Sequence, residues 1–306
     1  MNAETDSRSF LATILRTSRR VVNIIDQNGQ IFSAFNPPCS LDIVVGDEVC
    51  CELNAKDVVV KKVLTRRNCL KRAAAEREKR LAANLDHILI VTAPPPLYNT
   101  TFIDRVSVAA GVEKIPFSLV VNKIDLISDS DKLLFNTYRN LGINIYYTSA
   151  KTNVGIEALR ELMLGPGLKK IALVGVSGVG KSSLINLLIP NTDARVSETS
   201  WKTGQGRQTT SSAFAHSYNR DDGSRVFLID LPGIHNFGLC HVSEAQLRVA
   251  FPEIMDAAAS CQFDDCTHLL EPGCEVKILV DENKIAVSRY QSYTDILEEL
   301  RSKKPY

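Results

Sequence analysis

The sequence predicts a multidomain chain: a small N-terminal β-barrel, a central α/β domain and a mainly helical C-terminal domain. Three observations predict this order. Short strand-like runs without helical periodicity fill the first 64 residues, and apolar strand runs then alternate with helical segments as far as about residue 238. The remainder is mostly helical in pattern around a group of cysteines. We place the domain boundaries at 1–84, 85–240 and 241–306.

The composition is that of an ordinary soluble globular protein. Of the 306 residues, 44% are hydrophobic and 23% are charged. The first ten residues are polar and acidic where a signal peptide needs an apolar core, and no apolar run approaches the roughly 20 residues of a membrane span. We therefore expect a cytoplasmic protein with no membrane partner. We also expect a monomer, because no heptad pattern suggests self-association.

Five short strands are expected in the N-terminal region. Their sequences are FLATILR, VVNIID, IFSAF, DEVCCEL and DVVVKKVL. The dipeptide Asn28-Gly29 marks a hairpin turn between the second and third of them. A five-stranded barrel of this size is OB-like, and such barrels often bind RNA through their loops and one face.

Basic residues are concentrated directly after this region. Residues 61–80 contain nine lysines and arginines against Glu76 and Glu78, although the whole chain has a net charge of only +1. Such asymmetry suggests a face that binds a polyanion, of which nucleic acid is the common cytoplasmic example. The alternative is a solvated linker.

A complete P-loop lies in the strand-loop-helix context that it requires. The apolar run IALVG leads into Gly175-x-x-x-x-Gly180-Lys181-Ser182. Glycines allow consecutive N–H groups to turn toward phosphate oxygens, and Lys181 neutralises phosphate charge while Ser182 supplies a hydroxyl ligand to Mg²⁺. The expected phosphate-binding residues are Gly175, Val176, Ser177, Gly178, Val179, Gly180, Lys181, Ser182 and Ser183.

Two further elements select guanine. Asn122-Lys123-Ile124-Asp125 follows an apolar strand, and the Asp125 carboxylate can accept hydrogen bonds from the ring N–H and the exocyclic amine of guanine. Asn122 and Lys123 would brace the base and the P-loop. The next strand ends in Ser149-Ala150-Lys151, where a backbone N–H can meet the guanine carbonyl. All these residues are expected to contact the nucleotide.

Downstream, Asp230-x-x-Gly233 ends another strand. Asp230 can hold a Mg²⁺-bound water and Gly233 can bond the γ-phosphate. Thr209 or Thr210 supplies the switch hydroxyl, and the sequence does not decide between them. The expected catalytic residues are Lys181, Ser182, Thr209, Thr210, Asp230 and Gly233.

The motifs occur in a circularly permuted order, because both base-reading elements precede the P-loop. A pocket assembled from strand ends tolerates such rejoining of the chain. The residue after Gly233 is Ile234, where related enzymes carry a water-orienting glutamine, so slow intrinsic turnover is expected. The water-activating group is left open, with candidates Gln208, His235 and Arg207.

Near the C-terminus, CQFDDCTHLLEPGC places three cysteines and one histidine within fourteen residues. Three thiolates and one imidazole suit a tetrahedral structural zinc ion. Free thiols beside a surface histidine are the alternative reading, since the spacing is not that of a usual zinc finger. The expected ligands are Cys261, Cys266, His268 and Cys274.

The chain resembles the RsgA (YjeQ) family of bacterial GTPases that depend on the small ribosomal subunit. The resemblance rests on NKID, SAK, GVSGVGKSS, GQGRQTT, DLPG and CQFDDCTHLLEPGC in that order, and on the later RYQSY. It implies GTP hydrolysis to GDP, stimulated by the 30S subunit during its late maturation, with binding to 16S rRNA near the decoding region. The implied cofactors are structural Zn²⁺ and Mg²⁺ with GTP.

Two positions depart from the family pattern. Gln208 stands where a histidine is common, and Leu231 follows Asp230 where serine or threonine is common. A catalytic role assigned through that histidine is therefore doubtful in this chain.

Two alternatives to a GTPase stimulated by the 30S subunit stay open. One is an RNA-binding assembly scaffold that binds GTP with little hydrolysis, and the other is a permuted GTPase that acts on another RNA or on the large subunit.

Overall fold

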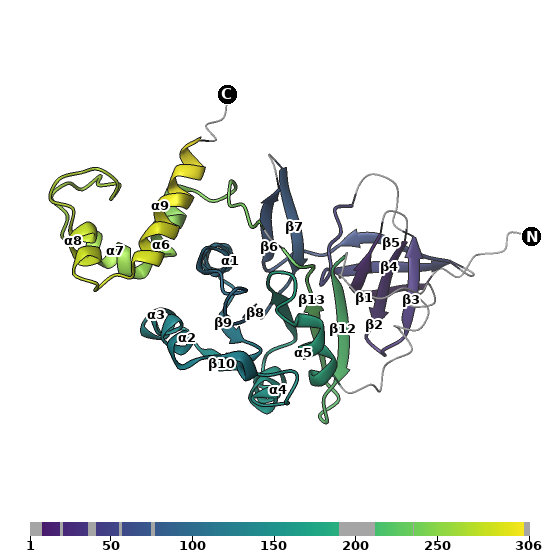
Figure 1. Cartoon of the computed structure of the whole chain (residues 1–306). Helices are drawn as coiled ribbons and strands as arrows, with labels where there is room; N and C mark the ends of the chain where they lie inside the picture. The colour runs from purple at the N-terminus through teal and green to yellow at the C-terminus, as the bar shows by residue number, and fades with distance from the viewer. Residues whose placement is uncertain are drawn as a thin grey trace, which may run out of the picture.

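The computed structural model forms a row of three parts, with the barrel at one end, the central sheet in the middle and the C-terminal helices at the other end (Figure 1). None of the helices in the described part of the chain is long and apolar enough to cross a membrane. The structure describes residues 8–18, 21–35, 41–54, 57–74, 77–189, 212–234 and 236–302.

The N-terminal part is a closed five-stranded barrel, which confirms the OB-like fold that the sequence predicts. β1 pairs with β2, β2 with β3, β3 with β5, β5 with β4, and β4 again with β1. Alternate residues such as Ile14, Ile24 and Val60 point inward and form its core. The strands are β1 (Arg8–Thr17), β2 (Val21–Asp26), β3 (Ile31–Phe35), β4 (Glu48–Asn54) and β5 (Asp57–Val63).

The basic stretch forms an antiparallel β-hairpin, made of β6 (Cys69–Ala74) and β7 (Arg77–Ala83). Neither this hairpin nor any strand in it follows from the sequence pattern. Leu70 and Leu81 are buried in the core shared by the central and C-terminal parts. The stretch is therefore not the solvated linker of the alternative reading, since one face of the hairpin is packed.

The central sheet has the order β10-β9-β8-β11-β13-β12, and every neighbouring pair is parallel except β12–β13. This confirms the mostly parallel sheet, although β12 is a strand that the sequence did not predict. β12 also pairs with β1 of the barrel at Phe214 and Arg16. The strands are β8 (His87–Thr92), β9 (Phe117–Val121), β10 (Ile145–Tyr147), β11 (Lys170–Val174), β12 (Phe214–Asn219) and β13 (Arg225–Asp230).

Helices cover both faces of this sheet. α1 packs on one face with residues such as Ile88 and Ile90 of β8, while α4 and α5 pack on the other with Leu89 and Val91. The Asn99 side chain caps α1 by accepting from the N–H of Phe102. The helices are α1 (Thr100–Val112), α2 (Asp129–Leu134), α3 (Asn136–Asn140), α4 (Ile156–Leu164) and α5 (Lys181–Leu188), with a 3₁₀ turn η1 (Ile124–Leu126).

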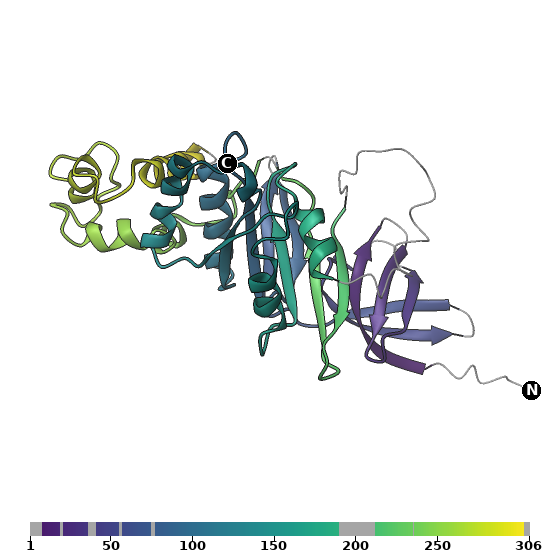
Figure 2. The same cartoon turned by 60° about the horizontal axis from the view of Figure 1, so that its bottom comes forward.

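The C-terminal part is helical and lies outside the sheet, as predicted. It contains α6 (Glu244–Val249), α7 (Pro252–Ala258), α8 (Glu275–Asp281) and α9 (Val287–Ser302). The last helix, α9, has 16 residues. Figure 2 shows these helices on the side of the central part that faces away from the barrel.

A buried ion pair joins α9 to α1. Arg289 donates from Nη1 to Oδ1 of Asp104 at 2.7 Å and from Nε to Oε1 of Glu253 at 2.7 Å. Asp104 is fully buried and also accepts from the hydroxyl of Tyr138 at 2.9 Å. The guanidinium lies 4.1 Å from the ring centre of Phe251. The ion pair therefore fixes the C-terminal helices to α1 of the central part.

We expect Arg289→Ala to lower the free energy of unfolding by about 3–5 kcal/mol, because it leaves the buried Asp104 carboxylate without its cation. The measurement is thermal unfolding followed by circular dichroism. Lys284→Ala, which breaks an exposed ion pair with Glu282, is the matched control and should leave the melting temperature unchanged. Equal melting temperatures for both variants would contradict this role of Arg289.

Candidate functional site

The glycine-rich loop between β11 and α5 has the close contacts that exclude other residues. A Cβ at Gly175 would lie 2.4 Å from the carbonyl oxygen of Val91, and one at Gly180 would lie 2.4 Å from Nδ2 of Asn122. Gly178 and Gly180 also have φ values of +86° and +95°. Gly175 is thus required by a neighbouring atom, Gly178 by its backbone conformation, and Gly180 by both.

Lys181 begins α5 and its side chain folds back under the loop. Its Nζ donates to the carbonyl oxygens of Gly175 at 2.9 Å and Val176 at 3.3 Å. Burial lowers the pKa of this ammonium, and the nearby Asp230 opposes that shift. The cation is therefore held in the concave side of the loop, where a phosphate group can meet it.

Ser182, in the first turn of α5, meets Asp230 at the end of β13. The Ser182 hydroxyl donates to Oδ2 of Asp230 at 3.2 Å. Hydroxyl and carboxylate oxygens are the hard ligands that Mg²⁺ accepts, usually together with waters and nucleotide phosphates. The two side chains therefore fit a magnesium ion carried by a bound nucleotide.

The Asp-x-x-Gly segment reaches the phosphate loop. A Cβ at Gly233 would lie 3.0 Å from both Cα and N of Ser177, and the Ile234 N–H donates to the Gly175 carbonyl at 3.3 Å. The Ile234 side chain is buried in the core, so it presents nothing polar to a water molecule. Several expected residues, namely Arg207, Gln208, Thr209, Thr210 and His235, lie outside the described residues.

Asn122 joins the glycine-rich loop to the loop after β10. Its buried side chain donates from Nδ2 to the Val179 carbonyl at 2.8 Å and accepts at Oδ1 from the Ala150 N–H at 3.1 Å. Thr148, which the sequence did not single out, also donates its hydroxyl to Oδ1 at 3.3 Å. One amide therefore sets the distance between the two halves of the site.

The Asp125 carboxylate is exposed at this junction. Its Oδ1 accepts from the Ser149 hydroxyl at 2.6 Å, and this hydrogen bond lowers the pKa of the carboxyl group. The carboxylate is therefore ionised at neutral pH and free to accept further N–H donors. It belongs to a cavity of about 340 Å³ whose lining residues are Asn122, Lys123, Asp125, Leu126, Ala150, Lys151, Gly180 and Ser183.

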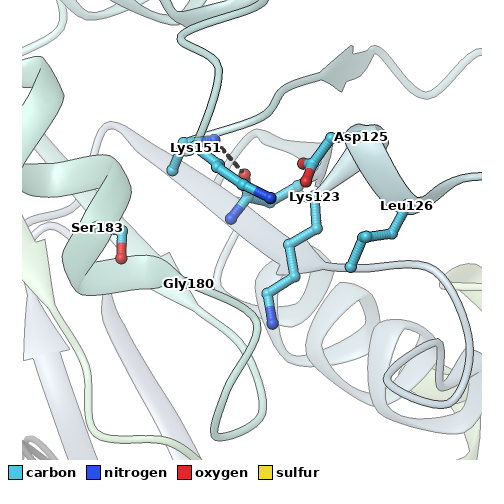
Figure 3. Close-up of a pocket in the computed structure, with 8 residues that line it drawn as sticks. Lys123, Asp125, Leu126, Lys151, Gly180 and Ser183 are labelled. Atoms are coloured by element: carbon cyan, nitrogen blue, oxygen red, sulfur yellow. Dashed lines mark hydrogen bonds between the residues drawn. The ribbon is translucent and has the colours of Figure 1, made fainter.

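Figure 3 shows this cavity with Lys123 and Asp125 on one side and Gly180 and Ser183 at the start of α5 on the other. The structure thus brings together Asp125 and Gly180, whose positions in the sequence differ by 55 residues. Leu126 is a lining residue that the sequence did not identify. The Leu126 side chain is 67% exposed beside the cavity. An exposed apolar side chain at this place indicates a binding role, because it can cover a planar base.

A second group of residues could hold a metal ion. The ligand atoms of the four expected residues, Cys261, Cys266, His268 and Cys274, all lie within 4.8 Å of one another. Nδ1 of His268 lies 3.6 Å from Sγ of Cys261 and 3.5 Å from Sγ of Cys274. These two sulfurs lie 4.0 Å apart. Zinc bond lengths place tetrahedral sulfur and nitrogen ligands about 3.6–3.8 Å apart, so the arrangement fits that ion.

The loop that carries these ligands is held by two side chains. The Glu271 carboxylate accepts from the N–H and hydroxyl of Thr267 and from the N–H groups of Leu269 and Leu270. Burial alone would raise the pKa of Glu271, but these hydrogen bonds lower it to about 2. The Tyr290 hydroxyl donates to the His268 carbonyl at 2.6 Å. The ligands are therefore preorganised.

Known proteins match both the sequence and the fold. The family model described as RsgA GTPase matches residues 63–240. A small ribosomal subunit biogenesis GTPase RsgA from Chlorobaculum parvum is 37% identical over 84% of this chain and 85% of its own length. The protein of the same name from Ralstonia pickettii is 38% identical over 87% and 85%.

Two solved structures are similar to this chain in fold. YjeQ from Thermotoga maritima matches with a TM-score of 0.70 at 29% identity, over 97% of this chain and all of that one. YloQ, a circularly permuted GTPase, has the same fold with a TM-score of 0.65 at 23% identity, over 100% and 99% of the two chains.

The permuted sheet, the glycine loop and the guanine-type motifs around one cavity define a circularly permuted GTPase. Within that class, the chain belongs to the RsgA GTPase family. It is therefore a GTP hydrolase, and the family resemblance read from the motifs is confirmed.

We expect Asp125→Asn to weaken GTP binding by at least ~10-fold, because it replaces an acceptor with a donor opposite the guanine N–H groups. Xanthine nucleotides, which offer a carbonyl at that position, should gain affinity. The measurement is titration with fluorescent nucleotides. Asp129→Asn, which changes an exposed carboxylate on α2 away from the cavity, is the control. Unchanged GTP affinity in Asp125→Asn would show that another group reads the base.

Proposed function

We propose that this chain binds GTP in the cavity between Asp125 and α5, hydrolyses it, and thereby assists late maturation of the 30S ribosomal subunit. The observation that carries the proposal is that Asp125 and Gly180 line one cavity. A guanine edge and a phosphate chain can therefore be held by the same pocket. The names of the relatives, small ribosomal subunit biogenesis GTPases, support the cellular role.

The proposed nucleotide contacts come from three loops at the carboxyl ends of parallel strands. Asn122 braces the loops, Asp125 reads guanine, and Lys181 neutralises phosphate charge. Ser182 and Asp230 hold Mg²⁺, which stabilises the developing charge on the phosphates when bound. The remaining proposed contacts are Lys123, Ile124, Ser149, Ala150, Lys151, Gly175, Val176, Ser177, Gly178, Val179, Gly180 and Ser183, with Gly233 and Thr209 or Thr210 at the γ-phosphate.

We propose that 16S rRNA binds the barrel and the outer face of the β6–β7 hairpin. Six of the nine basic residues already have partners within the chain: five pair with carboxylates and Arg72 donates to a carbonyl. The other three are Lys62, Arg77 and Lys79, which form no ion pair with any residue that the structure describes. Phosphates can therefore contact these three cations without breaking an internal ion pair.

We propose that the three thiolates and the imidazole hold a structural Zn²⁺ ion, since four protein ligands leave no open coordination position.

We further propose a monomeric, cytoplasmic protein with domains at residues 1–84, 85–240 and 241–306. The buried Ile234 favours slow basal hydrolysis that requires a partner to complete the site.

Purified 30S particles should accelerate GTP turnover from a slow basal rate, and 50S particles should not. The measurement is phosphate release with each particle and without any. Lys181→Ala, which lacks the phosphate-binding cation, should show no turnover in any condition. Equal wild-type rates throughout would remove the proposed function and favour a scaffold that binds GTP with little hydrolysis.

We expect the purified protein to contain one zinc ion per chain, measured by mass spectrometry of the metal. Cys266→Ser should lose the metal and lower the melting temperature, because the buried cluster loses a ligand. Cys240→Ser changes a half-buried thiol outside the cluster, and this variant should keep both the zinc content and the melting temperature of the wild type. Full zinc content in Cys266→Ser would contradict the ligand assignment.

A further inference from the structure

His268 faces the metal cluster through Nδ1, the ring nitrogen closer to its own main chain. Nδ1 lies 3.6 Å from Sγ of Cys261 and 3.5 Å from Sγ of Cys274, and the histidine is buried. The two ring nitrogens are distinct as metal ligands, and a metal held at Nδ1 lies nearer to the main chain than one held at Nε2. The position of the imidazole ligand therefore depends closely on the main chain at residue 268.

That main chain has a conformation that residues with a side chain rarely adopt. His268 has a φ of +65°, in the left-handed region where a Cβ is unfavourable. A residue keeps such a conformation only where the surrounding structure enforces it. Groups outside the ligand set must therefore hold this part of the chain.

The Glu271 carboxylate holds the main chain on both sides of His268. Its Oε1 accepts from the N–H of Thr267 at 2.8 Å and from the Thr267 hydroxyl. Its Oε2 accepts from the N–H groups of Leu269 at 3.0 Å and Leu270 at 3.1 Å. Hydrogen bonds to a charged acceptor are stronger than those between neutral groups. One carboxylate therefore fixes the residues before and after the imidazole ligand.

Tyr290 of α9 holds the His268 carbonyl itself. Its hydroxyl donates to this oxygen at 2.6 Å. The preceding residue, Arg289, is locked in the buried ion pairs with Asp104 and Glu253, which fix this part of α9. The hydroxyl is therefore presented to the metal loop, residues 261–274, from a fixed position.

Two of the thiol ligands have a separate support. Cys274 directly precedes α8, and the Gln262 N–H donates to the Gly273 carbonyl at 3.4 Å. This main-chain contact joins the neighbours of Cys261 and Cys274 without Glu271 or Tyr290. Loss of either of these two side chains therefore acts first on the imidazole.

We propose that Glu271 and Tyr290 are positioning residues, which set the zinc affinity of the chain by holding Nδ1 of His268 at the ligand position. This role rests on the proposed Zn²⁺ site and adds two residues that do not contact the metal. Groups that orient a metal ligand from outside typically change metal affinity roughly 10–100-fold.

Two conservative variants of the full chain test this role. Glu271→Gln keeps the size of the side chain, but however its amide turns, one pair of the former donors meets an NH₂ group. Tyr290→Phe removes only the hydroxyl. We expect each variant to raise the Kd for zinc at least ~10-fold, measured by competition with a chromogenic chelator. Wild-type affinity in both variants would overturn the proposal.

The chain offers a matched control for each variant. Glu282→Gln changes an exposed carboxylate of the same helical part, which pairs with Lys284 and not with the metal loop. Tyr218→Phe removes a hydroxyl from β12 in the central sheet. Both controls should bind zinc with wild-type affinity.

Cobalt distinguishes positioning from a general loss of stability. Tetrahedral Co²⁺ with thiolate ligands absorbs visible light, and its spectrum depends on the ligand set. At saturating Co²⁺ we expect the spectra of Glu271→Gln and Tyr290→Phe to shift toward that of His268→Ala, which lacks the imidazole. General destabilisation leaves the saturated spectrum unchanged, so weakened affinity with a wild-type spectrum would refute the positioning role.

The wild-type titration separates this role from the metal site itself. If the wild-type chain binds neither zinc nor cobalt, the proposed Zn²⁺ site fails, and the positioning role fails with it. If the wild type binds both ions and the two variants match it in affinity, only the positioning role fails and the zinc site stands.

Discussion

The carboxamide of Asn122 holds together the loops at the ends of β9, β10 and β11. It donates to the Val179 carbonyl and accepts from the N–H of Ala150, so the glycine-rich loop and the loop after β10 keep a fixed separation. The parallel sheet places all these strand ends along one edge. Permutation of the chain changes the order in which the strands are made, but it leaves their ends together. The pocket therefore depends on sheet geometry and on this one amide.

Much of the site could be predicted from sequence because its motifs are local. The P-loop and the two base-reading elements each follow an apolar strand, and a strand end fixes where the next few residues lie. The contacts that could not be predicted join segments that are distant in the sequence. Arg72 and Asn236 are 164 residues apart, and no pattern in either segment marks the pairing. The switch threonines lie outside the described residues, so their place stays a prediction.

The strands β6 and β7 were missed, as β12 was, and for these two the physical reason is their charge. β6 and β7 are rich in lysine and arginine, and such a sequence is typical of a solvated segment. The structure shows that Leu70 and Leu81 of these strands are buried. The RYQSY segment, which the sequence linked only to the family, has a structural explanation. Arg289 pairs with the buried Asp104, and Tyr290 holds the carbonyl of His268 in the metal loop. A structural residue that needs one particular contact is as restricted in type as a residue of the functional site. The sequence alone therefore does not distinguish the two.

The pairing of β12 with β1 at Phe214 and Arg16 makes the barrel an extension of the central sheet. β12 is antiparallel and would otherwise be a terminal strand whose N–H and C=O groups could recruit another chain. The Arg225 side chain reinforces the junction through the Asp26 carbonyl at 2.9 Å. The barrel therefore covers the Phe214 end of this strand edge, and a truncated chain that starts after the barrel would expose that end for pairing with another chain.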